Sequence, residues 1–223
     1  MNIPNILTVF RLIAAPAVGV VYVVFPTPYA DWIALSLFVV AALTDYVDGY
    51  LARKWWQVTA FGRMLDPIAD KAMVMIALLV VGIRSQFIPG YSNLTMLLPI
   101  ILIIFREVFV AGLREFLGDR ANTLKVTKLA KWKTAAQMVA ITVILASFLF
   151  GHYYWALSSG MNTEILIGIL DGEIEDRFGL RWIIPGFDWS VLIGSWLLWI
   201  AAILTFITGF DYFRKALPML KED

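Results

Sequence analysis

The sequence contains no cysteine and a single histidine among its 223 residues. Disulfide bonds and thiolate chemistry are therefore excluded. Charge is also scarce, at 16% of residues with a formal net charge of +1, which argues against nucleic acid as a partner. The chain is instead 61% hydrophobic, compared with roughly 45–50% in soluble proteins. We therefore predict an integral membrane protein.

The lengths of the apolar runs predict how often the chain crosses the membrane. A helix needs about 20 apolar residues to span the hydrocarbon, so the chain has room for six spans in one domain, residues 1–223. We expect an all-α fold in which a short amphipathic helix at the N-terminus leads into the first span. The predicted spans are residues 10–25, 31–53, 66–84, 94–117, 132–151 and 189–210.

The uneven distribution of basic residues predicts the orientation of these spans. Basic side chains are concentrated in residues 53–63, 114–133 and 214–221, whereas residues 164–188 are mainly acidic. Cytoplasmic loops carry the excess of Lys and Arg in membrane proteins. Both termini and the connection after the second span should therefore face the cytoplasm, in the cytoplasmic membrane. The N-terminus lacks the features of a cleaved signal peptide and is expected to be retained.

Four aspartates lie where the second and third predicted spans meet water: Asp45, Asp48, Asp66 and Asp70. Residues three or four apart share a helix face, so the acids form two pairs at adjacent helix ends. Close carboxylates repel one another unless a cation compensates them. Without His or Cys nearby, their oxygens favour Mg²⁺, Mn²⁺ or Ca²⁺ over zinc. In the alternative interpretation the acids only flank the spans and pair with nearby basic residues: Arg53, Lys54, Arg63 and Lys71.

Small residues accompany these acids at intervals of one helical turn. Gly49 follows Asp45 by four residues, and Gly62 precedes Asp66 by four. Such residues let a bulky ligand or a neighbouring helix come close to the backbone.

The complete pattern resembles the signature of the CDP-alcohol phosphotransferases: Asp45-x2-Asp48-Gly49-x2-Ala52-Arg53-x8-Gly62-x3-Asp66-x3-Asp70. The resemblance implies a six-helix membrane fold, usually dimeric, with a polar cavity for a CDP-linked substrate and two divalent cations, Mg²⁺ or Mn²⁺. It implies that the four aspartates hold the metals and that Asp70 also acts as the general base. The residues that it implies for the cytidine diphosphate pocket are Gly49, Ala52, Arg53 and Gly62.

Three further segments resemble the family members whose acceptor is glycerol 3-phosphate. They begin at Asn5-Ile-Leu-Thr8-Val-Phe-Arg11, at Arg106-Glu107 and at Lys131-Trp-Lys133-Thr134. The family usually has Gly where this chain has Ala130. The resemblance implies transfer of a phosphatidyl group from CDP-diacylglycerol to glycerol 3-phosphate, giving phosphatidylglycerol phosphate and CMP.

The charges in the fourth and fifth predicted spans fit the same acceptor. Its phosphate dianion needs basic groups in addition to the metals. Arg106 lies within an apolar span, where a charge is costly, and Arg114 falls on the same helical stripe. Lys131 and Lys133 could complete a phosphate-binding group. Contact of these lysines with anionic lipids is the alternative interpretation.

Two other functions are compatible with parts of this pattern. The same fold and chemistry could serve another acceptor: inositol phosphate, serine or phosphatidylglycerol. A more distant alternative is an ion or proton transporter in which the acids line the pathway. Transporters of that kind usually show internal repeats and interrupted helices at mid-membrane, and the sequence shows no repeat.

Overall fold

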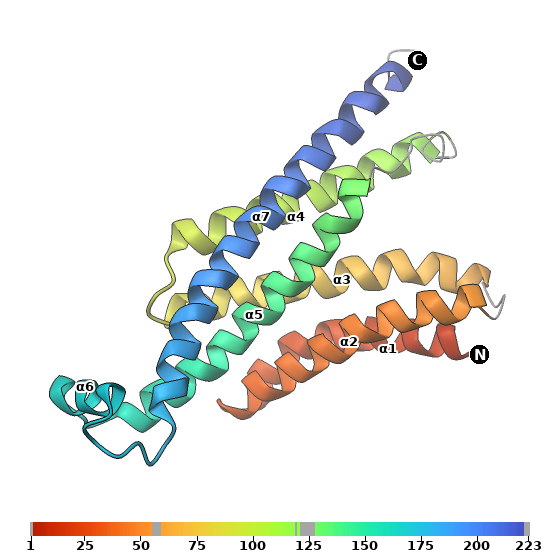
Figure 1. Ribbon diagram of the computed structural model, residues 1–223. Coiled ribbons are helices and arrows are strands. Elements are labelled where there is room, and N and C mark those ends of the chain that lie inside the picture. The colour runs from red at the N-terminus through yellow and green to blue at the C-terminus, as the bar shows by residue number, and fades with distance from the viewer. Residues whose placement is uncertain (1, 55–58, 119, 121–127, 221–223) are drawn as a thin grey trace.

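The computed structural model describes residues 2–54, 59–118, 120 and 128–220, without the side chains of residues 3–4, 46–54, 128–131 and 220. All the regular structure in these ranges is helical (Figure 1). The helices are α1 (Ile3–Val24), α2 (Tyr29–Lys54), α3 (Ala60–Arg84), the short 3-10 helix η1 (Ser85–Phe87), α4 (Asn93–Leu117), α5 (Lys128–Ser158), α6 (Thr163–Asp171) and α7 (Leu180–Leu220).

Each of the six predicted spans coincides with one long helix, although the first extends one residue beyond the end of α1; the helices are α1, α2, α3, α4, α5 and α7. Among the described residues, four segments are long and apolar enough to cross a membrane: Asn5–Val24, Asn93–Leu117, Trp132–Ser158 and Leu180–Met219. The protein is therefore an integral membrane protein. Helix α3 carries Asp66, Asp70 and Lys71 within its first half, which makes it less apolar than these four.

The N-terminal region differs from the prediction of a separate amphipathic helix. Helix α1 runs without a break from Ile3 to Val24. The polar residues that suggested a helix lying on the membrane, Asn5, Thr8 and Arg11, are instead buried. They lie on a helix that packs against both α2 and α3. The first polar turns of the chain therefore contribute to the interior of the protein.

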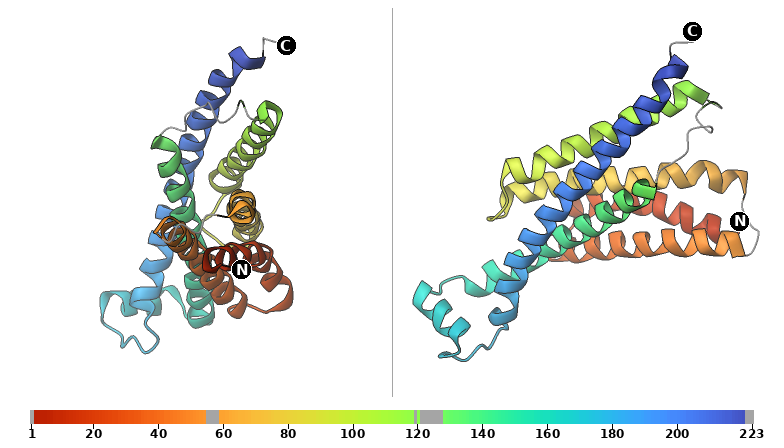
Figure 2. Two further views of the ribbon diagram at one scale, coloured as in Figure 1. Left: turned by 90° about the vertical axis from the view of Figure 1, so that its right-hand side faces the viewer. Right: turned by 45° about the horizontal axis from the view of Figure 1, so that its top comes forward.

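The helix ends that carry the charged segments gather at one end of the molecule. Figure 1 and Figure 2 show the starts of α1 and α3 and the ends of α2, α4 and α7 toward this end, with α6 at the opposite end. The structure thus brings together the described parts of the segments for which the distribution of basic residues predicted a common side.

Close helix packing, with small residues at the contacts, forms the core. Helix α5 packs along α7, and α1 packs on α2 and α3. Ala34, Ala77 and Ala201 are fully buried, and between the helices they accompany large side chains such as Phe38 and Phe148. Small residues let helices approach closely, which matters in lipid because water does not drive their association.

The connection between α5 and α7 is shorter than the gap between the predicted spans 132–151 and 189–210. Helix α5 continues to Ser158, and α7 begins at Leu180 rather than near residue 189. The Asp176 carboxylate accepts the backbone N–H groups of Leu180 and Arg181, which satisfies donors in the first turn of α7. These hydrogen bonds, that of Arg181 foremost, lower the pKa of Asp176.

Candidate active site

Three of the four predicted metal-binding acids converge on one arginine. Arg11 of α1 donates from Nη1 to Oδ1 of Asp45 on α2 and to Oδ1 of Asp70 on α3. Its Nη2 lies 3.4 Å from Oδ1 of Asp66. The Arg11 side chain is 3% exposed, whereas the three carboxylates are 46–47% exposed. A buried cation therefore lies beneath a cluster of acids that is open to solvent.

Other polar residues of α1 fix its position relative to the start of α3. The Thr8 hydroxyl donates to Asp66 Oδ1 at 2.6 Å. The Thr59 hydroxyl donates to Asn5 Oδ1 at 2.9 Å and accepts the backbone N–H of Gly62, so it also caps α3. A Cβ atom on Gly62 would lie 2.9 Å from Asn5 Oδ1. Gly62 is therefore required for the close contact between α1 and α3.

The donor set of this cluster fits hard divalent cations, because its ligands are all carboxylate oxygens. Among the described side chains, no three acidic or histidine residues are already arranged around a metal position. The Arg11 guanidinium supplies the positive charge between them. The predictions for Asp48 and for the nucleotide-pocket residues Gly49, Ala52 and Arg53 lie outside the described side chains.

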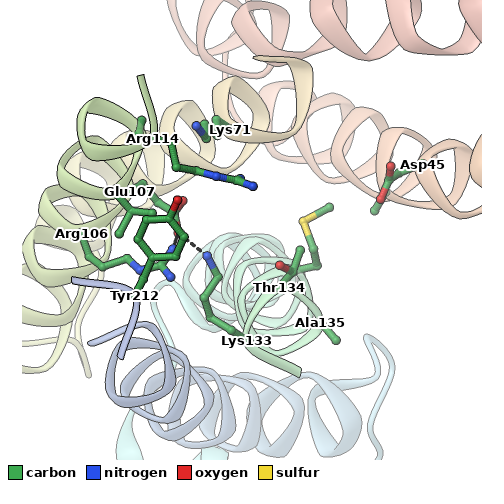
Figure 3. Close-up of a pocket in the computed structure, with 13 residues that line it drawn as sticks. Asp45, Lys71, Arg106, Glu107, Arg114, Lys133, Thr134, Ala135 and Tyr212 are labelled. Carbon is green, nitrogen blue, oxygen red and sulfur yellow. Dashed lines mark hydrogen bonds and ion pairs between the residues drawn. The ribbon is translucent and has the colours of Figure 1, made fainter. Parts of the chain in front are cut away.

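A cavity of about 760 Å³ extends from Asp45 to the basic residues of the fourth and fifth predicted spans. This volume is within the range of small-molecule sites, roughly 300–1,000 Å³. Figure 3 shows Asp45 on one side and Arg106 with Glu107 on the other, and the Arg114 guanidinium extends toward the space between them. The charged residues that line it are Asp45, Lys71, Arg106, Glu107, Arg114 and Lys133.

Glu107 connects two of the predicted phosphate-binding residues. Its Oε1 accepts a hydrogen bond from Lys133 Nζ of α5 and another, at 3.1 Å, from Arg106 Nη1. Arg106 Nη2 also donates to Thr208 Oγ1 of α7 at 3.1 Å. A Cβ atom on Gly209 would lie 2.7 Å from Arg106 Cγ. Glu107 of its own helix and Thr208 of α7 therefore fix the orientation of Arg106.

Arg114 is held less firmly than Arg106. Its side chain is exposed, and its guanidinium carbon lies 5.9 Å from the centroid of the Tyr212 ring. Such a cation–π contact leaves the guanidinium free to turn toward a ligand. Lys133 lies in the same cavity and is buried, while the Lys131 side chain is outside the described part of the chain.

The sequence interpretation gave no role to Arg11 or to Glu107. Both belong to segments that carried the family resemblance, and each places a charge in an apolar helix, where an ionised group needs a partner. The energetic cost of these charges was the signal in the sequence that could have identified both residues. The identity of the partners could not be read, because Arg11 is 34 residues from Asp45 and 59 from Asp70.

Comparison with known proteins identifies the family. The sequence model of the CDP-alcohol phosphatidyltransferase family matches residues 1–207, so the chain belongs to this family. The chain is 52% identical over 224 residues to the CDP-diacylglycerol–glycerol-3-phosphate 3-phosphatidyltransferase of Cereibacter sphaeroides, an alignment that covers 100% of this chain and 98% of that protein. Proteins of the same name from Rickettsia bellii and Pseudomonas fluorescens are 36% and 35% identical, over 96% and 100% of this chain and 94% of each relative.

Proposed function

We propose that this protein transfers the phosphatidyl group of CDP-diacylglycerol to glycerol 3-phosphate, producing phosphatidylglycerol phosphate and CMP. The observation that carries the proposal is the single cavity lined by both Asp45 and the basic group Arg106, Arg114 and Lys133. A metal-binding acid and a set of phosphate-binding cations thus face the same space. The names of the relatives support the same reaction.

The acids form the half of the site that takes the diphosphate. Two divalent cations, Mg²⁺ or Mn²⁺, held by Asp45, Asp48, Asp66 and Asp70, would supply positive charge to the diphosphate and to the departing CMP. Asp70 accepts the proton of the glycerol hydroxyl as the hydroxyl oxygen bonds to the β-phosphorus and the bond from that phosphorus to CMP breaks. Gly49, Ala52, Arg53 and Gly62 line the cytidine diphosphate pocket.

The basic side of the cavity binds the phosphate of the acceptor. Arg106 presents a guanidinium fixed by Glu107 and Thr208, which suits the fixed geometry of a phosphate. Lys133 contributes a second charge and Arg114 a third. We assign Lys131 to the same group from its place in the sequence, two residues before Lys133. The acceptor hydroxyl is thereby directed toward the acids on the opposite side of the cavity.

The same proposal includes the membrane arrangement. Six spans form a single catalytic domain, residues 1–223, in the cytoplasmic membrane, with both termini and the acids facing the cytoplasm. The apolar outer surfaces of the helices contact membrane lipid and the acyl chains of CDP-diacylglycerol, and the active protein is a homodimer. The location of the charged helix ends at one end of the molecule supports this orientation.

Acceptor-dependent CMP release tests the reaction. Purified protein would receive CDP-diacylglycerol, Mg²⁺ or Mn²⁺ and one of four acceptors: glycerol 3-phosphate, inositol phosphate, serine or phosphatidylglycerol. We expect selective CMP release with glycerol 3-phosphate. Faster turnover of another acceptor would overturn the choice of substrate. Ion flux in proteoliposomes without CMP release would instead support a transporter.

A further inference from the structure

Arg11 is a buried cation in contact with acids from two other helices. Its side chain is 3% exposed, and it bonds Asp45 of α2 together with Asp66 and Asp70 of α3. A buried guanidinium is stable only where anions compensate it. Close carboxylates in turn repel one another unless a cation lies among them. Each partner in this arrangement therefore depends on the other.

We propose that Arg11 is the internal counter-cation of the acid cluster: it holds Asp45, Asp66 and Asp70 together in the absence of metal and lowers their affinity for divalent cations. This inference rests on the metal site of the proposed function. It makes Arg11 a positioning residue, because it acts through the acids.

The direction from which Arg11 reaches the acids supports this role. The guanidinium lies beneath the cluster, on the side of the buried face of α1, while nearly half of each carboxylate side chain remains exposed. The cluster is therefore accessible to a cation from solvent. Such a cation approaches carboxylates whose negative charge Arg11 has already partly neutralised, and Coulomb repulsion from Arg11 opposes its binding.

The neighbouring contacts show that α1 is built to keep Arg11 at this position. Thr8 donates to Asp66 one turn earlier on the helix, and Asn5 accepts from Thr59 at the start of α3. These hydrogen bonds, in which the residues of α1 are uncharged, fix the register of α1 relative to α3. They carry no positive charge that could replace that of Arg11. Substitutions can therefore separate the positioning of α1 from the compensation of the negative charges.

The test compares Arg11→Gln and Arg11→Lys with wild-type protein and with Arg84→Gln as a matched control. Arg84 pairs with an aspartate at the other end of α3: its side chain is 24% exposed, and its Nη2 lies 3.3 Å from Oδ1 of the fully buried Asp31. Each purified protein is stripped of metal with EDTA and titrated with Mn²⁺. Binding is followed by electron paramagnetic resonance, and thermal unfolding is measured with and without Mn²⁺.

We expect Arg11→Gln to bind Mn²⁺ at least about tenfold more tightly than wild type, because a nearby positive charge has been removed. It should unfold at a lower temperature in EDTA and gain more stability from Mn²⁺. Arg11→Lys, which keeps the charge, should remain close to wild type in Mn²⁺ affinity. Arg84→Gln should lose thermal stability with no change in Mn²⁺ affinity.

Unchanged or weaker Mn²⁺ binding by Arg11→Gln would contradict the proposal. If this variant does not fold without metal, the double variant Arg11→Gln/Asp45→Asn, which also removes one negative charge, should fold in EDTA. Failure of the double variant as well would show that Arg11 is needed for packing and not for its charge, which overturns the proposal. The Mn²⁺ measurements do not depend on CMP release, so the two proposals can fail separately. Arg11-dependent Mn²⁺ binding in a protein that releases no CMP would refute the proposed function and leave the role of Arg11 standing.

Discussion

The acid cluster and the basic side of the cavity carry opposite charges, but in both regions a buried residue of the other sign compensates the like charges. In the cluster, a buried arginine from α1 binds three acids of α2 and α3. On the basic side, a buried glutamate of α4 binds Arg106 of its own helix and Lys133 of α5. Each region thus carries one residue of opposite charge that compensates its like charges without a ligand.

The two regions differ in how they are exposed and assembled. The acids are about half exposed, whereas Arg106, Glu107 and Lys133 have side chains only 9–12% exposed. The packing of α1 on α2 and α3 positions the acids, while contacts among α4, α5 and α7 position the basic group. Substitutions in the first set of helices should therefore disturb metal and nucleotide binding, and those in the second should disturb acceptor binding.

The largest effect is expected from Asp70→Asn in the acid cluster. Loss of the proposed general base should reduce the rate of CMP release by about 10²–10⁴-fold at saturating substrates. Thermal unfolding should show that the protein remains folded. A rate like that of wild type in detergent micelles would remove Asp70 from the proposed chemistry.

The next effect is expected from Glu107→Gln on the basic side. The substitution weakens the charged hydrogen bonds that orient Arg106 and Lys133, and such bonds contribute about 1.5–3 kcal/mol each. The KM for glycerol 3-phosphate should rise by about tenfold or more, while the KM for CDP-diacylglycerol stays near wild type. An equal rise in both KM values would show that the two regions are not separable.

Three glycine-to-alanine substitutions sharpen the comparison with smaller changes. Gly209→Ala places a Cβ atom 2.7 Å from Arg106 Cγ and should raise the KM for glycerol 3-phosphate. Gly62→Ala places one 2.9 Å from Asn5 Oδ1 and should weaken Mn²⁺-dependent activity instead. Gly112→Ala is the control, because its Cβ atom meets nothing within 4 Å. If Gly209→Ala and Gly62→Ala gave the same kinetic profile, the proposed division would be wrong.

The smallest effect is expected far from both regions, at Asp176. Its lowered pKa means that it stabilises the folded state at pH values above the usual aspartate pKa, and that this contribution is lost as the pH falls through the folded-state pKa. Asp176→Asn should lower the unfolding temperature slightly at neutral pH and leave CMP release unchanged. Thermal unfolding at decreasing pH should show the two proteins converge. A constant difference down to strongly acidic pH would contradict this explanation.

The sequence predicted much of the helical framework because the physical signals were local. Each apolar run that was predicted to span the membrane coincides with one long helix. The start of α7 was missed because Pro185 and Gly186 resemble a loop, although the Asp176 carboxylate, outside the helix, supplies acceptors for the donors of its first turn. The N-terminal polar residues were assigned to the membrane surface because amphipathicity does not say whether a polar face meets water or protein.

The candidate site was predictable where its chemistry follows from spacing along one helix. The separation of Asp66 from Asp70 and of Arg106 from Arg114 placed each pair on one helix face, and three of the predicted acids do contact one cation. The alternative interpretation named only basic partners near the acids in sequence. The structure shows Arg11 as a partner that is distant in sequence, which could not be predicted because the register of α1 against α3 depends on tertiary packing.

The most direct test of the account is the kinetics of CMP release by wild type and Arg106→Gln, measured while each substrate is varied separately in Mg²⁺. We predict that CMP release depends on glycerol 3-phosphate, and that Arg106→Gln raises the KM for glycerol 3-phosphate with little change in the KM for CDP-diacylglycerol. CMP release that is independent of glycerol 3-phosphate, or a variant that affects only the CDP-diacylglycerol KM, would contradict it.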